Sequence, residues 1–174
     1  YVQVFHHLYG LNTTILRYFH VYGMRQESNQ FGGVVAIFIR NITNSERPTV
    51  FGTGDQERSF TYVEDIVKAN LLTAVKKESR DEIYNCASGI KITVNELLKI
   101  ITSAFDSKIK PIHGDWMVGD IKKFNINNNK IKKLGMDFEK NFNKKIAEII
   151  QEIKNNNPND QKRSPQKQKN LRRF

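Results

Sequence analysis

Hydrophobic and polar positions along the chain change between two periodicities, one typical of helices and one typical of strands. Val2, Phe5 and Tyr9 lie at helical spacing just before Gly10, a residue type that is common at helix ends. Thr13–His20 follows as a run of mostly β-forming residues. We therefore expect a helix that ends at Gly10, followed by a buried strand.

The rest of the chain repeats this alternation. Polar turns separate further apolar stripes at helical spacing from further short strand-like runs. The predicted helices are Gly33–Asn44, Glu64–Lys77, one that begins at Thr93, Asn127–Leu134 and Asn141–Ile153, and the predicted strands are Glu82–Cys86 and Ile109–His113. Thr93 is the expected N-cap of its helix, because Glu96 follows three residues later and completes a capping box.

A polar turn with two glycines, after Thr49, Val50 and Phe51, carries the most informative chemistry. Gly52 and Gly54 permit a positive φ and a close approach of the backbone. Arg58 follows the turn, and a guanidinium there can bind a phosphate with two parallel donors. Phe51, before the turn, could cover a flat base. The alternative is a hairpin with a surface arginine.

The formal net charge of +10 is unevenly distributed. About half of it falls after Asn155, where one anion, Asp160, accompanies the cations Lys162, Arg163, Lys167, Lys169, Arg172 and Arg173. This composition predicts a disordered basic tail, and nucleic-acid binding through the tail is the weaker alternative function.

The remaining composition is that of a globular domain. The 174 residues are 39% hydrophobic and 26% charged. One cysteine, Cys86, excludes an intramolecular disulfide and favours a reducing, cytoplasmic setting. No apolar run approaches the roughly 20 residues that cross a bilayer. Because the chain begins with Tyr1 rather than Met, we expect it to be a fragment.

Four segments resemble, in the expected order, motifs of the extended short-chain dehydrogenase/reductase family, which contains the NAD-dependent nucleotide-sugar epimerases and dehydratases. They are LRYFHVYGMRQ at Leu16–Gln26, FGTGDQERSFTYVED at Phe51–Asp65, YNCASG at Tyr84–Gly89 and TVNEL at Thr93–Leu97. The resemblance is to UDP-glucose 4-epimerase-like members and covers Tyr1–Ile153.

The resemblance implies an α/β fold. Residues 1–153 would form the C-terminal part of a doubly wound, Rossmann-like parallel sheet together with the small α/β substrate-binding domain, and residues 154–174 would be the tail. It also implies NAD in the complete protein, a nucleotide-diphosphate sugar as substrate, and a homodimer.

The resemblance also assigns roles to individual residues. Phe19 would lie against the nicotinamide end of NAD, Arg58 would clamp phosphate, and Asp120 would bind the ribose. Val50 and Phe51 would form the wall of the base. The residues implied for the substrate are His20, Gly33, Val34, Thr49, Val50, Phe51, Arg58 and Asp120.

Three positions depart from the family pattern. His20 replaces the usual asparagine, Ser59 replaces the usual aspartate, and Met117 stands where the family has an arginine on the diphosphate. Loss of that bidentate contact would cost about 1.5–3 kcal/mol unless Lys122 or Lys123 replaces it.

The implied function is the nucleotide-sugar-binding half of an NAD-dependent epimerase or dehydratase that transiently oxidises a sugar hydroxyl. The chain contains neither the G-x-x-G-x-x-G fingerprint for NAD nor the family's catalytic Tyr-x-x-x-Lys, so we expect no turnover by these 174 residues alone. The alternative is a non-catalytic relative that binds a nucleotide sugar.

Several reactive residue types have structural explanations. His6 and His7 are adjacent and should point to different faces of their helix, so we expect packing rather than metal binding. Asp65 suits the start of a helix. Cys86 suits a strand interior. Trp116 either caps the core or stacks on a base.

Overall fold

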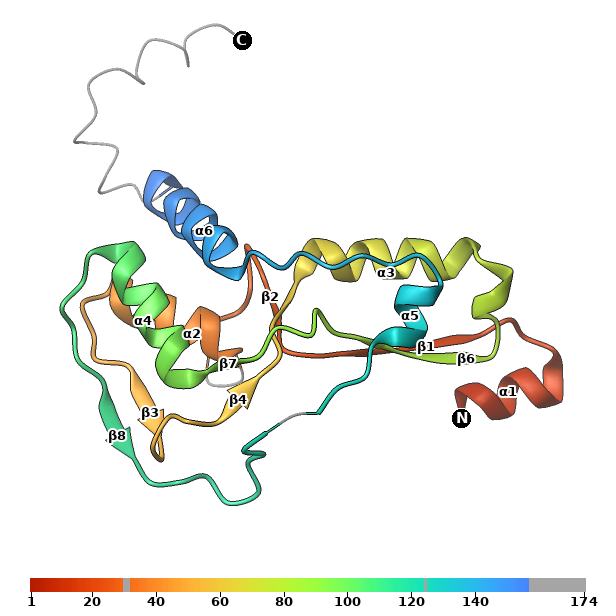
Figure 1. The fold of residues 1–174 in the computed structure, drawn as a ribbon, viewed down its shortest axis with the longest axis horizontal. Coiled ribbons are helices and arrows are strands. Elements are labelled where there is room, and N and C mark those ends of the chain that lie inside the picture. The colour runs from red at the N-terminus through yellow and green to blue at the C-terminus, as the bar shows by residue number, and fades with distance from the viewer. Residues whose placement is uncertain (30–31, 124, 157–174) are drawn as a thin grey trace, which may run out of the picture.

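Two parallel strands form the centre of one side of the protein, as the computed structural model of residues 1–29, 32–123 and 125–156 shows (Figure 1). β1 (Thr14–Tyr18) pairs with β6 (Glu82–Cys86) in register from Thr14 opposite Glu82 to Tyr18 opposite Cys86. α3 (Val63–Val75) and α5 (Asn129–Lys133) pack with these strands. Their shared core is Ile66, Ala69, Tyr84, Cys86, Ile131, Met136 and Phe138.

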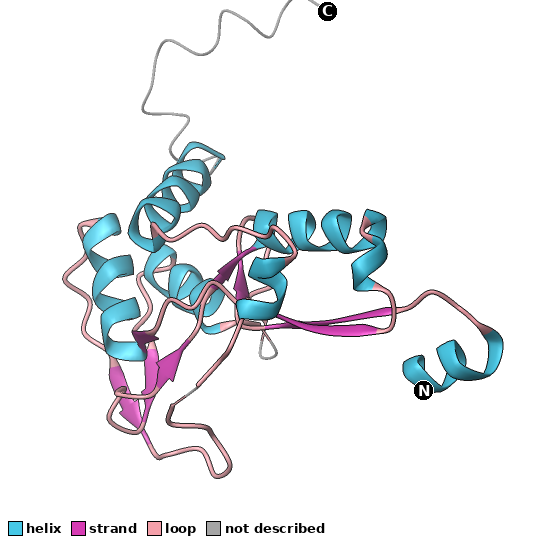
Figure 2. Cartoon of the chain, turned by 45° about the vertical axis from the view of Figure 1, so that its right-hand side comes forward, coloured by secondary structure: helices cyan, strands magenta, loops and turns pink. Residues whose placement is uncertain are grey.

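α1 (Val2–Tyr9) lies beside this part of the fold, at one end of the molecule in both ribbon views (Figures 1 and 2). It ends at Gly10, whose φ is 65°, which confirms the predicted stop. None of its residues is buried. The helix therefore presents apolar side chains to solvent, among them Leu8 and Tyr9.

A second core joins three helices on the other side of the molecule. α2 (Val34–Thr43), α4 (Val94–Phe105) and α6 (Phe142–Asn156) pack around one cluster of buried residues. Tyr22 and Phe142 lie in that cluster with their ring centroids 4.9 Å apart. Phe142 is the first residue of α6, so its contact with Tyr22 anchors the beginning of this helix in the core.

Short strands join the two parts. β2 (Val21–Tyr22) pairs in parallel with β5 (Thr61–Tyr62), directly before α3. β3 (Thr49–Phe51) pairs in parallel with β8 (Ile112–Gly114). These pairs confirm an α/β fold built on parallel strands.

One antiparallel pair closes the turn after β3. β4 (Glu57–Arg58) runs antiparallel to β7 (Ile92–Thr93), which leads into α4. Thr93 Oγ1 accepts a hydrogen bond from the Glu96 backbone N–H, and the Glu96 carboxylate accepts one from the Thr93 backbone N–H. The predicted capping box is therefore confirmed.

Element boundaries shift where proline, caps and tertiary contacts intervene. The predicted strand Ile109–His113 begins only after Pro111, where Ile112 donates its backbone N–H to the Pro48 carbonyl. α3 ends at Val75, and a short 3-10 helix, η1 (Lys77–Ser79), follows. α6 continues to Asn156, past the predicted end at Ile153. From residue 157 on, the predicted basic tail lies outside the described residues.

No helix in the described part of the chain combines the length and apolar character that a membrane span needs.

Candidate functional site

The turn between β3 and β4 is shaped by two glycines with positive φ. Gly52 has a φ of 68°, and a Cβ there would lie 2.7 Å from the ring of Trp116. Gly54 has a φ of 81°, and its Cβ would meet the side-chain oxygen of Asn95 at 2.1 Å. Asn95 is held in place because its amide donates to the Thr53 carbonyl at 2.8 Å. Glycine is therefore required at both positions by conformation and by space.

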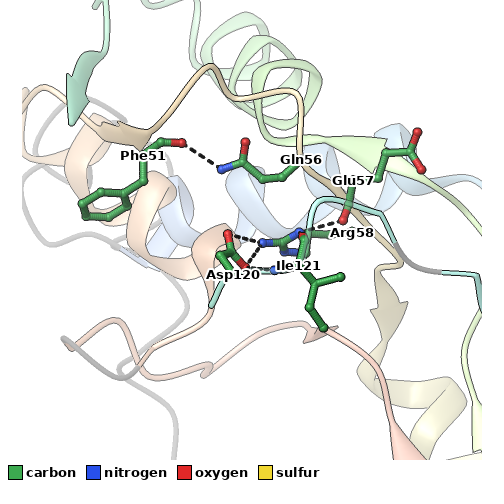
Figure 3. A network of polar contacts seen from close by, with 6 residues as sticks. All are labelled: Phe51, Gln56, Glu57, Arg58, Asp120 and Ile121. Atoms are coloured by element: carbon green, nitrogen blue, oxygen red, sulfur yellow. Dashed lines mark hydrogen bonds and ion pairs between the residues drawn. The ribbon is translucent and has the colours of Figure 1, made fainter. Parts of the chain in front are cut away.

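Arg58 and Asp120 form an ion pair beside this turn (Figure 3). Nη2 of Arg58 donates to both carboxylate oxygens of Asp120, at 2.5 and 2.6 Å. Nη1 donates to the backbone carbonyls of Ile121 at 2.6 Å and Glu57 at 2.8 Å. The Arg58 side chain is only 11% exposed. The guanidinium is thus held in one position by contacts from both β4 and the loop that follows β8.

His20 belongs to the same electrostatic group. Burial first, and the positive charge of Arg58 second, lower the pKa of His20 from its ordinary value of 6.5, while Ser59 and Asp120 act in the opposite direction. Its φ is 36°, in a region that non-glycine residues rarely adopt. The structure therefore brings together His20, Arg58 and Asp120, three of the residues that the resemblance assigned to the substrate.

The residues predicted to line the base have different environments. Val50 is fully buried in the core, so only its backbone is available to a ligand. Phe51 is 44% exposed, and its ring packs over Gly114, where a Cβ would come within 3.2 Å of it. The ring points away from the Arg58–Asp120 pair (Figure 3). Thr49 is exposed on β3. Phe51 and Thr49 are thus the side chains of β3 that could face a base.

Phe19, Gly33 and Val34 lie outside this ion-paired group. Phe19 follows β1 directly and is half-buried. Gly33 is the N-cap of α2, and a Cβ there would meet the amide nitrogen of Gln26 at 2.5 Å. Val34 opens α2 and packs partly against the three-helix core. A Cβ at Gly33 would therefore displace the end of the Gln26 side chain, whatever the part of Gly33 in binding.

Met117 and Lys122 lie on the loop that carries Asp120. Met117, at the family's arginine position, is 54% exposed. The ammonium of Lys122 lies 5.4 Å from the centroid of the half-buried Trp116 ring. The Lys122 carbonyl also accepts a hydrogen bond from the Glu57 backbone N–H at 2.8 Å. Lys122, a second cationic residue, is therefore bonded through its backbone to β4, the strand that carries Arg58.

Gln56 and Ile121 are contributors that the sequence reasoning missed. Gln56 is buried, and its side-chain amide donates to the Phe51 carbonyl at 3.0 Å, which closes the turn. Ile121 contributes only its backbone carbonyl, which no residue pattern can indicate. The sequence does not show that Gln56 is buried, so its need for a local partner became visible only in the structure.

Asp65 and Cys86 are part of the structure rather than of this site. Asp65 is fully buried, and Oδ2 accepts a hydrogen bond from the Glu139 backbone N–H at 2.7 Å. It therefore joins α3 to the segment before α6. Burial raises the pKa of the Cys86 thiol to about 11, so the thiol stays protonated near neutral pH and is a poor nucleophile.

Two cavities are present elsewhere. One, of about 490 Å³, lies between β1 and the end of α3, and the other, of about 220 Å³, lies between α2 and α6. None of the nine predicted site residues lines either cavity. The candidate site is therefore separate from these two cavities, and it is an ion-paired group next to a turn.

Comparisons with known proteins give a consistent result. Residues 1–87 match the NAD dependent epimerase/dehydratase family. The chain is 34% identical over 157 residues to a putative UDP-glucose 4-epimerase of Methanocaldococcus jannaschii, covering 90% of this chain and 50% of that protein. It is 30% identical to the UDP-glucuronate 4-epimerase of Thermodesulfobacterium geofontis, covering 86% of this chain and 49% of that one.

Solved structures agree. The UDP-glucose 4-epimerase of Thermotoga maritima with UDP-glucose superposes with a TM-score of 0.84 at 32% identity, over 89% of this chain and 50% of that one. The UDP-N-acetylglucosamine 4-epimerase of Methanobrevibacter ruminantium M1, in complex with UDP-N-acetylmuramic acid, gives 0.82 at 35% identity, over 87% and 49%. The chain thus spans about half the length of these relatives.

Proposed function

Because this chain belongs to the NAD-dependent epimerase/dehydratase family, we propose that it is the nucleotide-sugar-binding part of an enzyme that epimerises or dehydrates the sugar of a nucleoside diphosphate. Relatives over this length of chain have been solved with UDP-glucose and UDP-N-acetylmuramic acid. The observation that carries the proposal is the guanidinium of Arg58, which is mostly buried and held in a fixed position beside a glycine turn.

Arg58 binds the diphosphate in this proposal. A guanidinium whose position is already fixed loses little side-chain entropy when a phosphate arrives, and its planar donors suit two phosphate oxygens. Its present partner is the Asp120 carboxylate. We infer an exchange in which phosphate replaces that carboxylate, and Asp120, 29% exposed, then accepts a hydrogen bond from a ribose hydroxyl. Binding energy from the nucleotide would position the sugar for reaction.

Lys122 supplies the second positive charge that Met117 cannot. Its backbone carbonyl accepts a hydrogen bond from Glu57 of β4, which places Lys122 beside the strand that carries Arg58, and its ammonium lies over the Trp116 ring. A lysine is a point charge and binds phosphate with less geometric specificity than an arginine. Phe51 would cover the base, together with Thr49.

NAD is the cofactor of the complete protein in this proposal, and it would supply the hydride acceptor. Phe19 fits one part of it, since the half-buried ring at the carboxyl end of β1 leaves an aromatic surface that suits the nicotinamide face. The 174 residues contain no Tyr-x-x-x-Lys and no G-x-x-G-x-x-G, so we propose that they do not turn over substrate by themselves. The complete protein would be a cytoplasmic homodimer.

A non-catalytic protein that binds a nucleotide sugar is the second candidate. It is favoured by Met117 and by Ser59, which is buried in place of the family's aspartate. NADH-linked turnover by a protein that contains this chain together with Tyr-x-x-x-Lys would exclude it.

A thermal-shift series tests nucleotide-sugar binding. UDP-glucose, dTDP-glucose and GDP-mannose should include one ligand that raises the melting temperature of the 174-residue chain, because a ligand that binds only the folded state stabilises it. Uridine, thymidine and guanosine are the matched controls, and they should give little shift because they lack the diphosphate. Equal shifts with the nucleoside and the nucleotide sugar would contradict the role of Arg58.

A further inference from the structure

Three metal-ligating side chains converge beside α1, which Figure 1 shows far from β4, the strand that carries Arg58. His6 and His7 belong to α1, and Asp81 lies just before β6, at the amino end of that strand. Nε2 of His6 lies 3.7 Å from Oδ2 of Asp81, and Nδ1 of His7 lies 3.9 Å from the same oxygen. All three ligand atoms lie within 4.8 Å of one another. The sequence predicts that these adjacent histidines point to different faces of the helix and pack rather than bind a metal, but both rings approach the same carboxylate oxygen.

The hydrogen bond that His6 makes determines which of its ring nitrogens is available to bind a metal. Its Nδ1–H donates to the Leu11 carbonyl at 2.5 Å. In a neutral imidazole this leaves the lone pair on Nε2, the nitrogen next to Asp81. Histidines that bind metals commonly have this arrangement, with the second ring nitrogen donating to a carbonyl or carboxylate.

Asp81 is held in an unusual conformation with one unsatisfied oxygen. Its φ is 56°, which is rare for a residue other than glycine, and its backbone N–H donates to the Thr13 carbonyl at 2.6 Å. Oδ1 is buried, and no hydrogen-bond donor reaches it among the described residues. A buried carboxylate oxygen without a donor is costly, and a cation bound to the carboxylate would offset that cost.

We propose that His6, His7 and Asp81 form a binding site for a divalent transition metal such as Zn²⁺. Two imidazole nitrogens and a carboxylate are ordinary zinc ligands, with bonds of about 2.0–2.2 Å. Two ligand atoms of one tetrahedral ion lie about 3.5 Å apart at those bond lengths. The carboxylate-to-imidazole distances of 3.7 and 3.9 Å are slightly longer, and all three ligand atoms lie within 4.8 Å of one another, so small side-chain rotations would bring them onto one ion. Three protein ligands leave one position of a tetrahedral ion to water.

The bound ion would fasten α1 to the fold. Within the described residues no residue of α1 is buried, so in the 174-residue chain the metal–ligand bonds would add to the few contacts of this helix. The metal would link His6 of α1 to Asp81, the residue directly before β6 of the β1–β6 pair. The site is independent of the nucleotide-sugar function, so either can fail without the other. The competing account is an exposed ion pair, which contributes little to stability.

Isothermal titration of the untagged 174-residue chain with ZnCl₂ tests the site, and CoCl₂ provides a spectroscopic probe. We expect one bound equivalent, an increase in melting temperature on binding, and visible Co²⁺ bands of a four-coordinate ion. His7→Gln is the preferred variant, because this side chain is 70% exposed and its loss should leave the fold intact. Its affinity should fall at least about 10–100-fold, the range seen when metal sites lose supporting groups.

His113→Gln is the matched control, because His113 is an exposed histidine of β8 that lies outside the cluster. Asp81→Asn is a second variant, since asparagine tolerates a positive φ and keeps the size of the side chain. Loss of binding in His7→Gln and Asp81→Asn, with retention in His113→Gln, would establish the site. Absence of a one-equivalent isotherm in the parent chain, or equal affinity in His7→Gln and the parent, would overturn it.

Discussion

Arg58 and Asp120 are 62 positions apart in the sequence and form one charged group in the structure. Motif resemblance assigned them separate roles, one on phosphate and one on ribose. It could not show that they pair, because the pairing depends on the path of the loop that follows β8. The backbone carbonyl of Ile121 is equally invisible to sequence reasoning, since any residue carries one. The resemblance could assign a role to each residue, but it could not show which residues contact one another.

His20 gives a pH-dependent prediction at this scale. Its pKa in the folded protein is lowered from 6.5, so the unfolded chain binds a proton at a higher pH than the folded one. His20 therefore contributes stability above about pH 6.5, and that contribution is lost as the pH falls towards the folded pKa. Replacement by the family's asparagine, which tolerates a positive φ, should make the free energy of unfolding less dependent on pH in this range.

Urea unfolding of His20→Asn and the parent at pH 7.5 and 5.5 measures this effect. The parent should lose more stability between the two pH values than the variant does. His113→Asn is the control and should follow the parent. An identical loss in His20→Asn and the parent would show that the environment of His20 does not oppose its protonation.

At the scale of elements, local rules predicted most of the fold. The helix stop at Gly10 and the capping box of α4 depend on residues a few positions apart, and both are confirmed. The strand at Ile112–Gly114 was placed too early, because its pairing partner β3 lies far away in the sequence and Pro111 cannot donate to a ladder. The antiparallel pair of β4 and β7 was not predicted, since two-residue strands carry no periodicity.

The glycine turn gives a prediction at the element scale. Gly54 and Gly119 have similar φ values, 81° and 86°, but a Cβ would strike the side chain of Asn95 only at Gly54. Alanine should destabilise the protein at both positions through the backbone, and more at Gly54, where Asn95 must give up its bond to Thr53. The difference should be about 1 kcal/mol, the worth of one hydrogen bond.

Chemical denaturation of Gly54→Ala and Gly119→Ala, analysed at equal m-values, measures that difference. If both variants lost the same free energy of unfolding, Asn95 would have moved aside without losing stability. The close packing of the turn would then not constrain the side chain of Asn95.

At the scale of the whole molecule, the chain leaves an apolar face uncovered. Val67, Leu71 and Val75 lie four residues apart along α3 and are all exposed, by 53%, 65% and 78%. The opposite side of the helix is buried against β6 and α5. The apolar residues of α3 lie at helical spacing in the sequence, but periodicity alone cannot say which of them find a partner.

This face predicts self-association of the isolated chain. A contiguous exposed apolar stripe is removed from water when two molecules meet. Leu71→Gln with Val75→Gln should lower the apparent mass in sedimentation velocity at concentrations where the parent associates. Lys99→Gln, on the exposed side of α4, is the control and should leave association unchanged. Association that is the same in the double variant would place the contact elsewhere.

Binding of the nucleotide-sugar diphosphate by Arg58 is the interaction on which the proposed function depends. Its most direct test is isothermal titration of the 174-residue chain and of Arg58→Lys with UDP-glucose or whichever nucleotide sugar gives the largest thermal shift. Arg47→Lys is the control, because Arg47 is an exposed arginine that bonds only to the Lys110 and Pro111 carbonyls among the described residues. A lysine keeps the charge but cannot donate in parallel to two oxygens, so the affinity of Arg58→Lys should fall by about 1.5–3 kcal/mol, or roughly 10–150-fold. Affinity that is unchanged in Arg58→Lys would contradict the account.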